Sequence, residues 1–211
     1  CSAVGLDEVD SVEEYVVSSG PERTIFASYG AMLADRRWNP PDRSDIARSA
    51  MVCLDPFFGE DSETAAEWCT LERVPYVTID TTPDADLARR AEALVISQEF
   101  ADRTFGGLDA AEVFGAYADR CRGLIILTRG GGATWWGRAG GPPHQLPAFP
   151  VDVVDTAGAG DSFRAGVVRG LLRGDPDDEV VRSASAIAAM VCASSPGVVH
   201  SPTEDELAAY L

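Results

Sequence analysis

Short apolar runs alternate with longer amphipathic stretches along most of the chain. The pattern predicts buried strands at 51–54, 76–79, 94–96 and 124–127, and helices at 62–71, 84–92, 97–105 and 108–120. Apolar strands that each lead into a helix are typical of a mainly parallel sheet with helices on both faces. The chain is therefore expected to have a doubly wound α/β fold.

The pattern changes after Thr128. The elements predicted there are antiparallel strands at 133–136 and 145–149 across a Gly- and Pro-rich connection, a strand at 151–154, and helices at 160–173, 178–193 and from 203 onward. Two β-like runs, at 12–17 and 24–27, precede the first buried strand. Because no linker divides the sequence, residues 1–211 are expected to form a single domain.

The charge of the chain excludes some classes of partner. Asp and Glu number 34 against 17 basic residues, all of them Arg, and the net charge is −17. A surface this acidic repels nucleic acids and anionic membranes, so neither is an expected partner. The absence of Lys has two open explanations, GC-rich coding and adaptation to high salt. Neither explanation indicates what the protein does.

The cysteines and histidines bear on metal binding and on the compartment. Five widely spaced cysteines without a C-x-x-C pair, together with two histidines, argue against a zinc site. They favour a reduced, cytoplasmic setting. The sequence contains neither an apolar run long enough to span a membrane nor a secretion signal.

The most informative stretch is D-T-A-G-A-G-D-S-F at 155–163. Small residues allow backbone N–H groups to approach an anion closely, and the N-terminal end of a helix favours negative charge. An Asp beside such an anion site is typical of a group that takes a proton from something near a phosphate. The stretch therefore predicts a phosphoryl-transfer site.

The same string, with the A-G pair that follows it, resembles the second signature of the ribokinase/PfkB family of carbohydrate kinases. The resemblance implies the family's doubly wound α/β fold, in agreement with the alternation of strands and helices. It implies that Asp161 is the general base that deprotonates the acceptor hydroxyl. It also implies that the N–H groups of Gly158, Ala159 and Gly160 form the anion hole for the γ-phosphoryl group.

The resemblance further implies ATP and Mg²⁺ as cofactors. Thr128 and Gly130 match the family's T-x-G strand end, which meets the nucleotide phosphates, although the spacing to the next glycine is one residue short. The alternative is that this stretch is only a Gly-rich hairpin turn. Ser97 replaces the Asn that many members carry at this place, a replacement that resembles the ketohexokinase-like branch, and the resemblance implies that Ser97 helps to bind the nucleotide. Glu99 is one position earlier than the family's acid that helps to organise Mg²⁺ through water, and it is the candidate for that supporting role here.

Several of these residues have a plain structural alternative. Asp155 stands where the family often places a ligand for K⁺, but it could equally cap the following turn. Ala186, Ala189 and Gly197 resemble the helix and loop beside the adenine, and small residues also serve tight helix packing. Glu99 could be a surface acid in the first turn of a helix, without a metal.

The resemblance covers the chain but only the latter two thirds of a usual family member. Cys1 corresponds to a point past the family's Gly-Gly signature, and 12–27 resembles the stretch that follows the lid. The leading hypothesis is an ATP-dependent kinase that phosphorylates a hydroxyl of a small-molecule sugar or sugar acid. The alternatives are a nucleoside kinase of the same family and a truncated, non-catalytic nucleotide-binding homologue. A homodimer is among the assemblies left open.

Overall fold

The computed structural model describes residues 14–19, 22–27 and 39–211, and the chain divides into two units, residues 1–40 and 41–211. In the first unit, β1 (Glu14–Ser19) pairs antiparallel with β2 (Glu22–Ala27). This confirms the two β-like runs, although residues 12, 13, 20 and 21 lie outside the described part. The single-domain expectation stays a prediction, because a division into units does not by itself show two domains.

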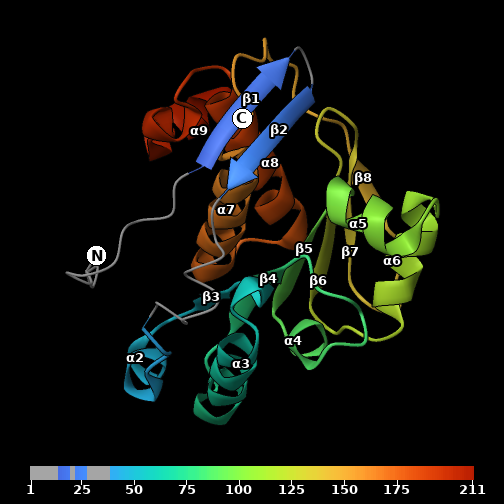
Figure 1. Ribbon diagram of the computed structural model, residues 1–211, viewed down its shortest axis with the longest axis vertical. Helices are drawn as coiled ribbons and strands as arrows, with labels where there is room; N and C mark the ends of the chain where they lie inside the picture. The colour runs from blue at the N-terminus through green and yellow to red at the C-terminus, as the bar shows by residue number, and fades with distance from the viewer. Residues whose placement is uncertain (1–13, 20–21, 28–38) are drawn as a thin grey trace. The chain divides into compact units, whose positions relative to one another are not determined.

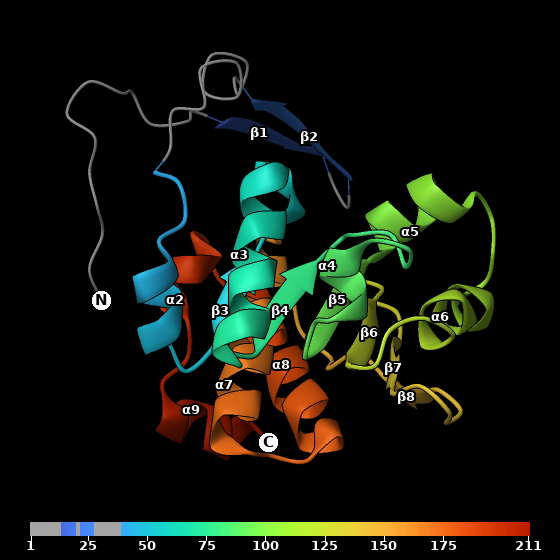
Figure 2. The ribbon, with the colours of Figure 1, turned by 90° about the horizontal axis from the view of Figure 1, so that it is seen from below.

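The second unit is a six-stranded sheet with helices packed on both faces (Figures 1 and 2). Its strands, which follow one another across the sheet in chain order, are β3 (Val52–Leu54), β4 (Tyr76–Ile79), β5 (Ala93–Ser97), β6 (Leu124–Thr128), β7 (Thr134–Gly137) and β8 (His144–Leu146). Strands β3 to β6 are parallel, and β7 and β8 continue the sheet antiparallel. The predicted mainly parallel sheet and antiparallel hairpin are confirmed.

One helix of this unit precedes the sheet, and the others connect its strands or follow it. They are α2 (Arg43–Arg48), α3 (Glu60–Glu72), α4 (Asp86–Arg89), α5 (Gln98–Phe105), α6 (Ala110–Ala118), α7 (Ala159–Arg173), α8 (Asp177–Cys192) and α9 (Glu204–Tyr210), with the 3₁₀ turns η1 (Pro56–Phe58) and η2 (Gly197–His200). Helix α9 begins with a capping box, since the Thr203 and Glu206 side chains each accept the other residue's backbone N–H.

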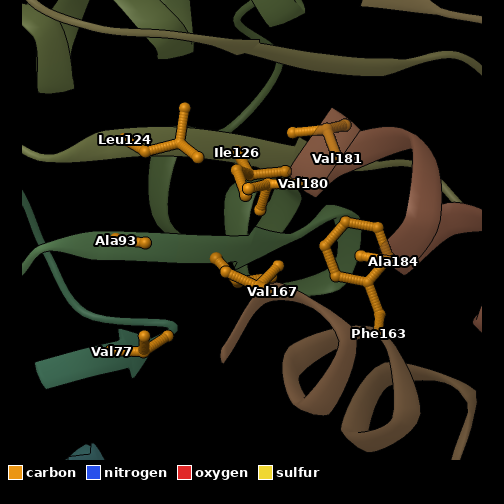
Figure 3. Close-up of a cluster of buried hydrophobic side chains, with 10 residues drawn as sticks. Val77, Ala93, Leu124, Ile126, Phe163, Val167, Val180, Val181 and Ala184 are labelled. Atoms are coloured by element: carbon orange, nitrogen blue, oxygen red, sulfur yellow. The ribbon is translucent and has the colours of Figure 1, made fainter. Parts of the chain in front are cut away.

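Alternate residues of each strand point to opposite faces of the sheet, and each face has its own core. Figure 3 shows the first core, in which strand residues Val77, Ala93, Val95, Leu124 and Ile126 pack against Phe163 and Val167 of α7 and Val180, Val181 and Ala184 of α8. The neighbouring strand residues Leu94, Ile96, Ile125 and Leu127 pack against Ala110, Val113, Phe114 and Tyr117 of α6. The strong apolar character of the strands therefore comes from burial on both faces.

Helices α7 and α8 approach each other closely at two glycines of α7. A Cβ on Gly166 would lie 2.7 Å from the Cα of Ala184, and one on Gly170 would lie 2.9 Å from a methyl group of Val180. Neither position can carry a side chain without moving α8. The close approach fixes α7, whose first turn contains Asp161, against the sheet.

Replacing Gly166 by Ala is expected to lower the free energy of unfolding by about 1–3 kcal/mol, because the new methyl group overpacks the helix contact. This loss should exceed the gain of roughly 1 kcal/mol that Ala brings to a helix interior. Urea denaturation of Gly115→Ala is the control, since a Cβ on Gly115 of α6 would have no neighbouring atom within 4 Å. Equal stability of the two variants would contradict the packing argument.

Two expectations about secondary structure were wrong, and one helix was missed. Residues 151–154 form no strand; instead the N–H groups of Val154 and Asp155 both donate to the carbonyl of Cys192, at 2.8 and 3.2 Å, which ties this loop to the end of α8. The helix expected at 84–92 is the single turn α4, because the N–H of Glu92 already donates to Tyr76 of the sheet. Helix α2 was not expected, although the Asp42 side chain caps it in a recognisable way.

Candidate functional site

The carboxyl ends of the parallel strands bring polar residues together along one edge of the sheet. Asp55 follows β3, Asp80 follows β4, and Ser97 and Thr128 are the last residues of β5 and β6. This edge of an open α/β sheet is where ligands usually bind. Ser97 and Thr128, both predicted to meet the nucleotide, are register partners and therefore lie side by side.

Ser97 joins this edge to Asp80 through two hydrogen bonds. The Ser97 backbone N–H donates to one Asp80 carboxylate oxygen at 2.7 Å, and its hydroxyl donates to the other at 2.9 Å. The same hydroxyl accepts the N–H of Phe100 at 3.1 Å and so caps α5. Asp80 also has a positive φ of 37°, a conformation that Asp and Asn adopt more readily than most residues. Sequence analysis missed Asp80.

The environment of Asp80 disfavours its charged form. Burial raises the pKa of the Asp80 carboxyl above its ordinary value of 3.8, and the nearby charge of Asp55 acts in the same direction. The hydrogen bonds from Ser97 and the charge of Arg103 oppose the shift without cancelling it. Since the folded state then binds a proton more readily than the unfolded state, this carboxyl contributes most to stability at low pH and loses that contribution as the pH rises.

Replacing Asp80 by Asn is expected to raise stability at neutral pH, because the amide keeps the shape and the tolerated backbone conformation without burying a charge. The advantage over wild type should shrink as the pH falls toward the ordinary pKa of Asp80. Urea denaturation at several pH values between about 4 and 7 measures this difference. Asp119→Asn, at an exposed position, controls for the loss of one negative charge. A variant less stable than wild type at neutral pH would refute the expectation.

The predicted anion-binding stretch folds into a tight turn that leads into α7. Gly158 is the N-cap residue of α7 with φ 76°, and a Cβ there would lie 2.1 Å from a methyl group of Val198 in η2. The N–H of Ala159 donates to the carbonyl of Thr156 at 3.3 Å, while Gly160 is exposed with open space around it. The positive end of a 15-residue helix dipole therefore lies at an exposed glycine turn, an arrangement suited to an anion.

Asp161 lies in the first turn of α7 with 75% of its side chain exposed. One nitrogen of Arg164 donates to its carboxylate at 3.1 Å. Another nitrogen of Arg164 is 3.6 Å from the carboxylate of Asp55, which follows β3. Arg164 thus joins the start of α7 to the strand edge, and neither Arg164 nor Asp55 was singled out by sequence analysis.

Asp155 holds the turn before α7 in place. One of its carboxylate oxygens accepts the N–H of Ala157 at 2.9 Å, and the other accepts the hydroxyl of Ser195 at 2.9 Å. The turn-capping alternative for this residue is therefore confirmed. Its K⁺-binding role stays a prediction, and a bound cation would share the carboxylate with these two donors.

The remaining predicted residues lie in surroundings of different kinds. The Glu99 side chain is 82% exposed and 3.9 Å from Arg103 one turn along α5, which fits a surface acid. Ala186 and Ala189 are buried in α8. Gly197 is buried too, and a Cβ on it would lie 2.5 Å from the carbonyl oxygen of Val191. Gly130 occupies a positive-φ turn at 53° directly after β6.

The predicted residues thus form two groups. Ser97 and Thr128 lie at the strand edge, whereas Asp155, Gly197 and residues 158–161 surround the start of α7, where η2 contacts both α7 and α8. Asp55 and Asp80 lie at the strand edge. Arg164 lies between the two groups, because it contacts both Asp55 and Asp161. For Asp55 and Asp80 the sequence signal was an acid directly after a predicted strand, and for Arg164 a position one helical turn after Asp161.

Residues 39–211 and the two described strands of the first unit contain neither a ready-made metal cluster nor a helix that could span a membrane. Within them, no three His, Cys, Asp or Glu side chains come together as a ready-made metal cluster. Mg²⁺ in phosphoryl-transfer sites usually takes one or two carboxylates together with substrate phosphates, so it does not require such a cluster. No helix in the same part of the chain has the length and apolar character needed to cross a bilayer.

Comparison with known proteins gives matches along nearly the whole chain. A family model described as "pfkB family carbohydrate kinase" matches residues 15–204. The Escherichia coli (strain K12) protein "Uncharacterized sugar kinase YegV" is 34% identical over 218 residues, which cover 91% of this chain and 64% of that protein. The 1-phosphofructokinase of the same organism is 30% identical over 191 residues, covering 84% and 61%. The chain therefore spans less than two thirds of the length of either relative.

A solved structure of similar fold is that of Arabidopsis thaliana ribokinase complexed with ribose and ATP. It matches with a TM-score of 0.80 and 20% sequence identity, covering 98% of this chain and 73% of that one. At this identity the likeness shows the fold alone. The doubly wound α/β fold expected from the sequence is thereby confirmed.

Proposed function

Because the chain belongs to the pfkB family of carbohydrate kinases, we propose that the protein transfers the γ-phosphoryl group of ATP to a hydroxyl of a sugar or sugar acid. The observation that carries the proposal is the turn at 155–160, where a glycine at φ 76° leads into the 15-residue helix α7. An exposed carboxylate, that of Asp161, stands in the first turn of that helix. This arrangement supports the proposal that the helix end binds an anion and that Asp161 is the base beside it.

In the proposed reaction, Asp161 takes the proton of the acceptor hydroxyl while the hydroxyl oxygen attacks the γ-phosphorus of ATP. The bond between that phosphorus and the oxygen bridging to the β-phosphate breaks, and ADP leaves with the electron pair. The N–H groups of Gly158, Ala159 and Gly160 are proposed to stabilise the charge on the phosphoryl oxygens, with the N–H of Ala159 shared between the phosphoryl group and the carbonyl of Thr156. Since little covalent chemistry is required of the protein, positioning and electrostatics account for most of the acceleration.

The nucleotide is proposed to lie between the two groups of residues. Thr128 and Gly130 would meet its phosphates, and the helix and loop that contain Ala186, Ala189 and Gly197 would lie beside its base. Because Ala186 and Ala189 are buried, they are proposed to shape the helix surface beside the base and not to contact the base directly. Ser97 would act through its hydrogen bonds with Asp80 at the same edge.

Mg²⁺ is proposed to bind with the ATP phosphates, and the carboxylates available at the strand edge suit a hard cation. When bound, Mg²⁺ neutralises charge on the phosphates. Glu99 would support it only through water, because its side chain lies on the exposed surface of α5. Asp155 is the proposed ligand for K⁺, which would stabilise the turn before α7.

The acceptor is proposed to be a small-molecule sugar or sugar acid in the cytoplasm, rather than a nucleic acid or a lipid. The net charge of −17 supports the exclusion of polyanionic partners. A nucleoside acceptor and a non-catalytic role are the outcomes against which this proposal is tested. A homodimer is proposed as the assembly, and sedimentation equilibrium measures it directly.

The test is a panel of sugars, sugar acids and nucleosides incubated with ATP and Mg²⁺, with ADP release as the measurement. The full-length protein should phosphorylate at least one sugar or sugar acid far faster than any nucleoside. If only nucleosides are phosphorylated, the acceptor is a nucleoside and not a sugar. If the protein binds nucleotide but phosphorylates no acceptor, the non-catalytic alternative is favoured. Product analysis by mass spectrometry distinguishes phosphorylation of the acceptor from simple hydrolysis of ATP.

A further inference from the structure

Arg164 is among the least exposed of the arginines that form ion pairs in residues 39–211. Only 20% of its side chain is exposed, compared with 69% for Arg103 in the surface pair with Glu99. Its guanidinium stands between two carboxylates, 3.1 Å from Asp161 and 3.6 Å from Asp55. The stem of the side chain is therefore enclosed while its charged end faces the proposed base.

Asp55 is itself fixed at the end of β3. Its side chain accepts the N–H of Phe57 at 2.9 Å, and its carbonyl accepts the hydroxyl of Ser62 in α3 at 2.5 Å. A chain of contacts thus runs from the strand edge through Asp55 and Arg164 to the carboxylate of Asp161. The side chains of Arg164 and Asp55 are 20% and 35% exposed, whereas that of Asp161 is 75% exposed.

An ion pair with one exposed partner adds little to stability, typically about 0–1 kcal/mol, so stability alone does not account for this arrangement. Orientation accounts for it better. An exposed Asp side chain moves among several rotamers, and a general base works only from the one that reaches the acceptor hydroxyl. A partner fixed elsewhere in the fold restricts that motion before the substrate binds.

We infer that Arg164 is a positioning residue, which holds the carboxylate of Asp161 in the orientation that meets the acceptor hydroxyl, with Asp55 as its anchor. The inference rests on the proposed function, in which Asp161 is the base. It assigns no contact between Arg164 and the phosphates. Arg164 acts on the reaction through Asp161, and Asp55 acts through Arg164.

The test compares kcat and KM of the wild type with those of Arg164→Met, Arg164→Lys and Asp55→Asn, using the acceptor found with the panel. Arg164→Met should lower kcat by about 10- to 100-fold while changing the KM for ATP by less than about twofold, as expected for a misplaced group. Arg164→Lys should recover part of kcat, because an ammonium group can pair with only one of the carboxylates at a time. Asp55→Asn should lower kcat less than Arg164→Met does.

The double variant with both Arg164→Met and Asp55→Asn separates positioning from two independent effects. Because Asp55 acts through Arg164, the double variant should be no slower than Arg164→Met alone. Arg169→Met is the matched control: Arg169 lies on the same helix, is 25% exposed, and forms an ion pair with Glu204 of α9 away from the base. It should change the melting temperature little and leave kcat unchanged.

The outcomes separate the inference from the proposed function. If the wild type is active and Arg164→Met keeps its kcat or gains activity, the inference is overturned and the proposed function stands. The inference is also overturned if the losses of kcat in Arg164→Met and Asp55→Asn multiply in the double variant. If the wild type phosphorylates no acceptor, the proposed function fails and the inference fails with it. Should Arg164→Met not fold, as circular dichroism would show, Asp55→Asn and Arg164→Lys decide the question.

Discussion

Replacing Asp161 by Asn should lower kcat by roughly 1000-fold, within the range of about 10²–10⁴ that a general base contributes. The amide keeps the size of the side chain but cannot accept the proton of the acceptor hydroxyl. The KM for ATP should change little, since the side chain is exposed at the start of α7 and the proposed phosphate contacts come from backbone N–H groups. ADP release with a saturating acceptor measures the effect.

The matched control for this substitution is Asp178→Asn. Asp178 is also an exposed acid in the first turn of a helix, in this case α8. Each variant loses one favourable interaction with a helix dipole, worth about 0.3–1 kcal/mol, so the two should lose similar stability. Only Asp161→Asn should lose activity. Full activity of Asp161→Asn would remove this residue as the base, even if the protein proves to be a kinase.

Hydrophobic pattern predicted the sheet well because its central strands are buried on both faces. Residues 76–79 and 124–127 are largely apolar, and the structure places them in β4 and β6. The pattern failed at 151–154, which is just as rich in β-branched residues. There the backbone N–H groups are bound by the end of α8, and a tertiary contact of this kind leaves no mark in the local sequence.

The candidate site was predictable only in part, for a similar reason. The string at 155–163 carries its own turn and helix start, so local sequence was enough to place Asp161 in the first turn of a helix. Asp55, Asp80 and Arg164 are ordinary residues in their local sequence. They become site residues because the parallel strands end at one edge and α7 packs across the sheet. The order of the strands in the sheet, and not the local sequence, brings these residues together.

Replacing Gly158 by Ala should lower kcat by about 100-fold, because a misplacement of about 1 Å in a catalytic group can have an effect of that size. Two causes act together. A residue with a side chain is strained at φ 76°, and its Cβ would lie 2.1 Å from a methyl group of Val198. Relief of this contact would move the turn whose N–H groups are proposed to bind the phosphoryl group. Initial rates at varied ATP and acceptor concentrations measure the loss.

A second substitution separates the two causes. Val198→Ala removes the methyl group that the new Cβ would meet, and Val198 is exposed, so this change alone should leave both activity and stability nearly intact. Added to Gly158→Ala, it should restore the part of kcat lost to the steric contact and leave the part lost to backbone strain.

Gly160→Ala is the companion control, since no atom lies within 4 Å of the position of a Cβ on Gly160. If the double variant is as slow as Gly158→Ala, strain alone sets the geometry of the turn. If Gly160→Ala is equally slow, the loss comes from crowding of the bound phosphoryl group and the contact with Val198 does not explain it.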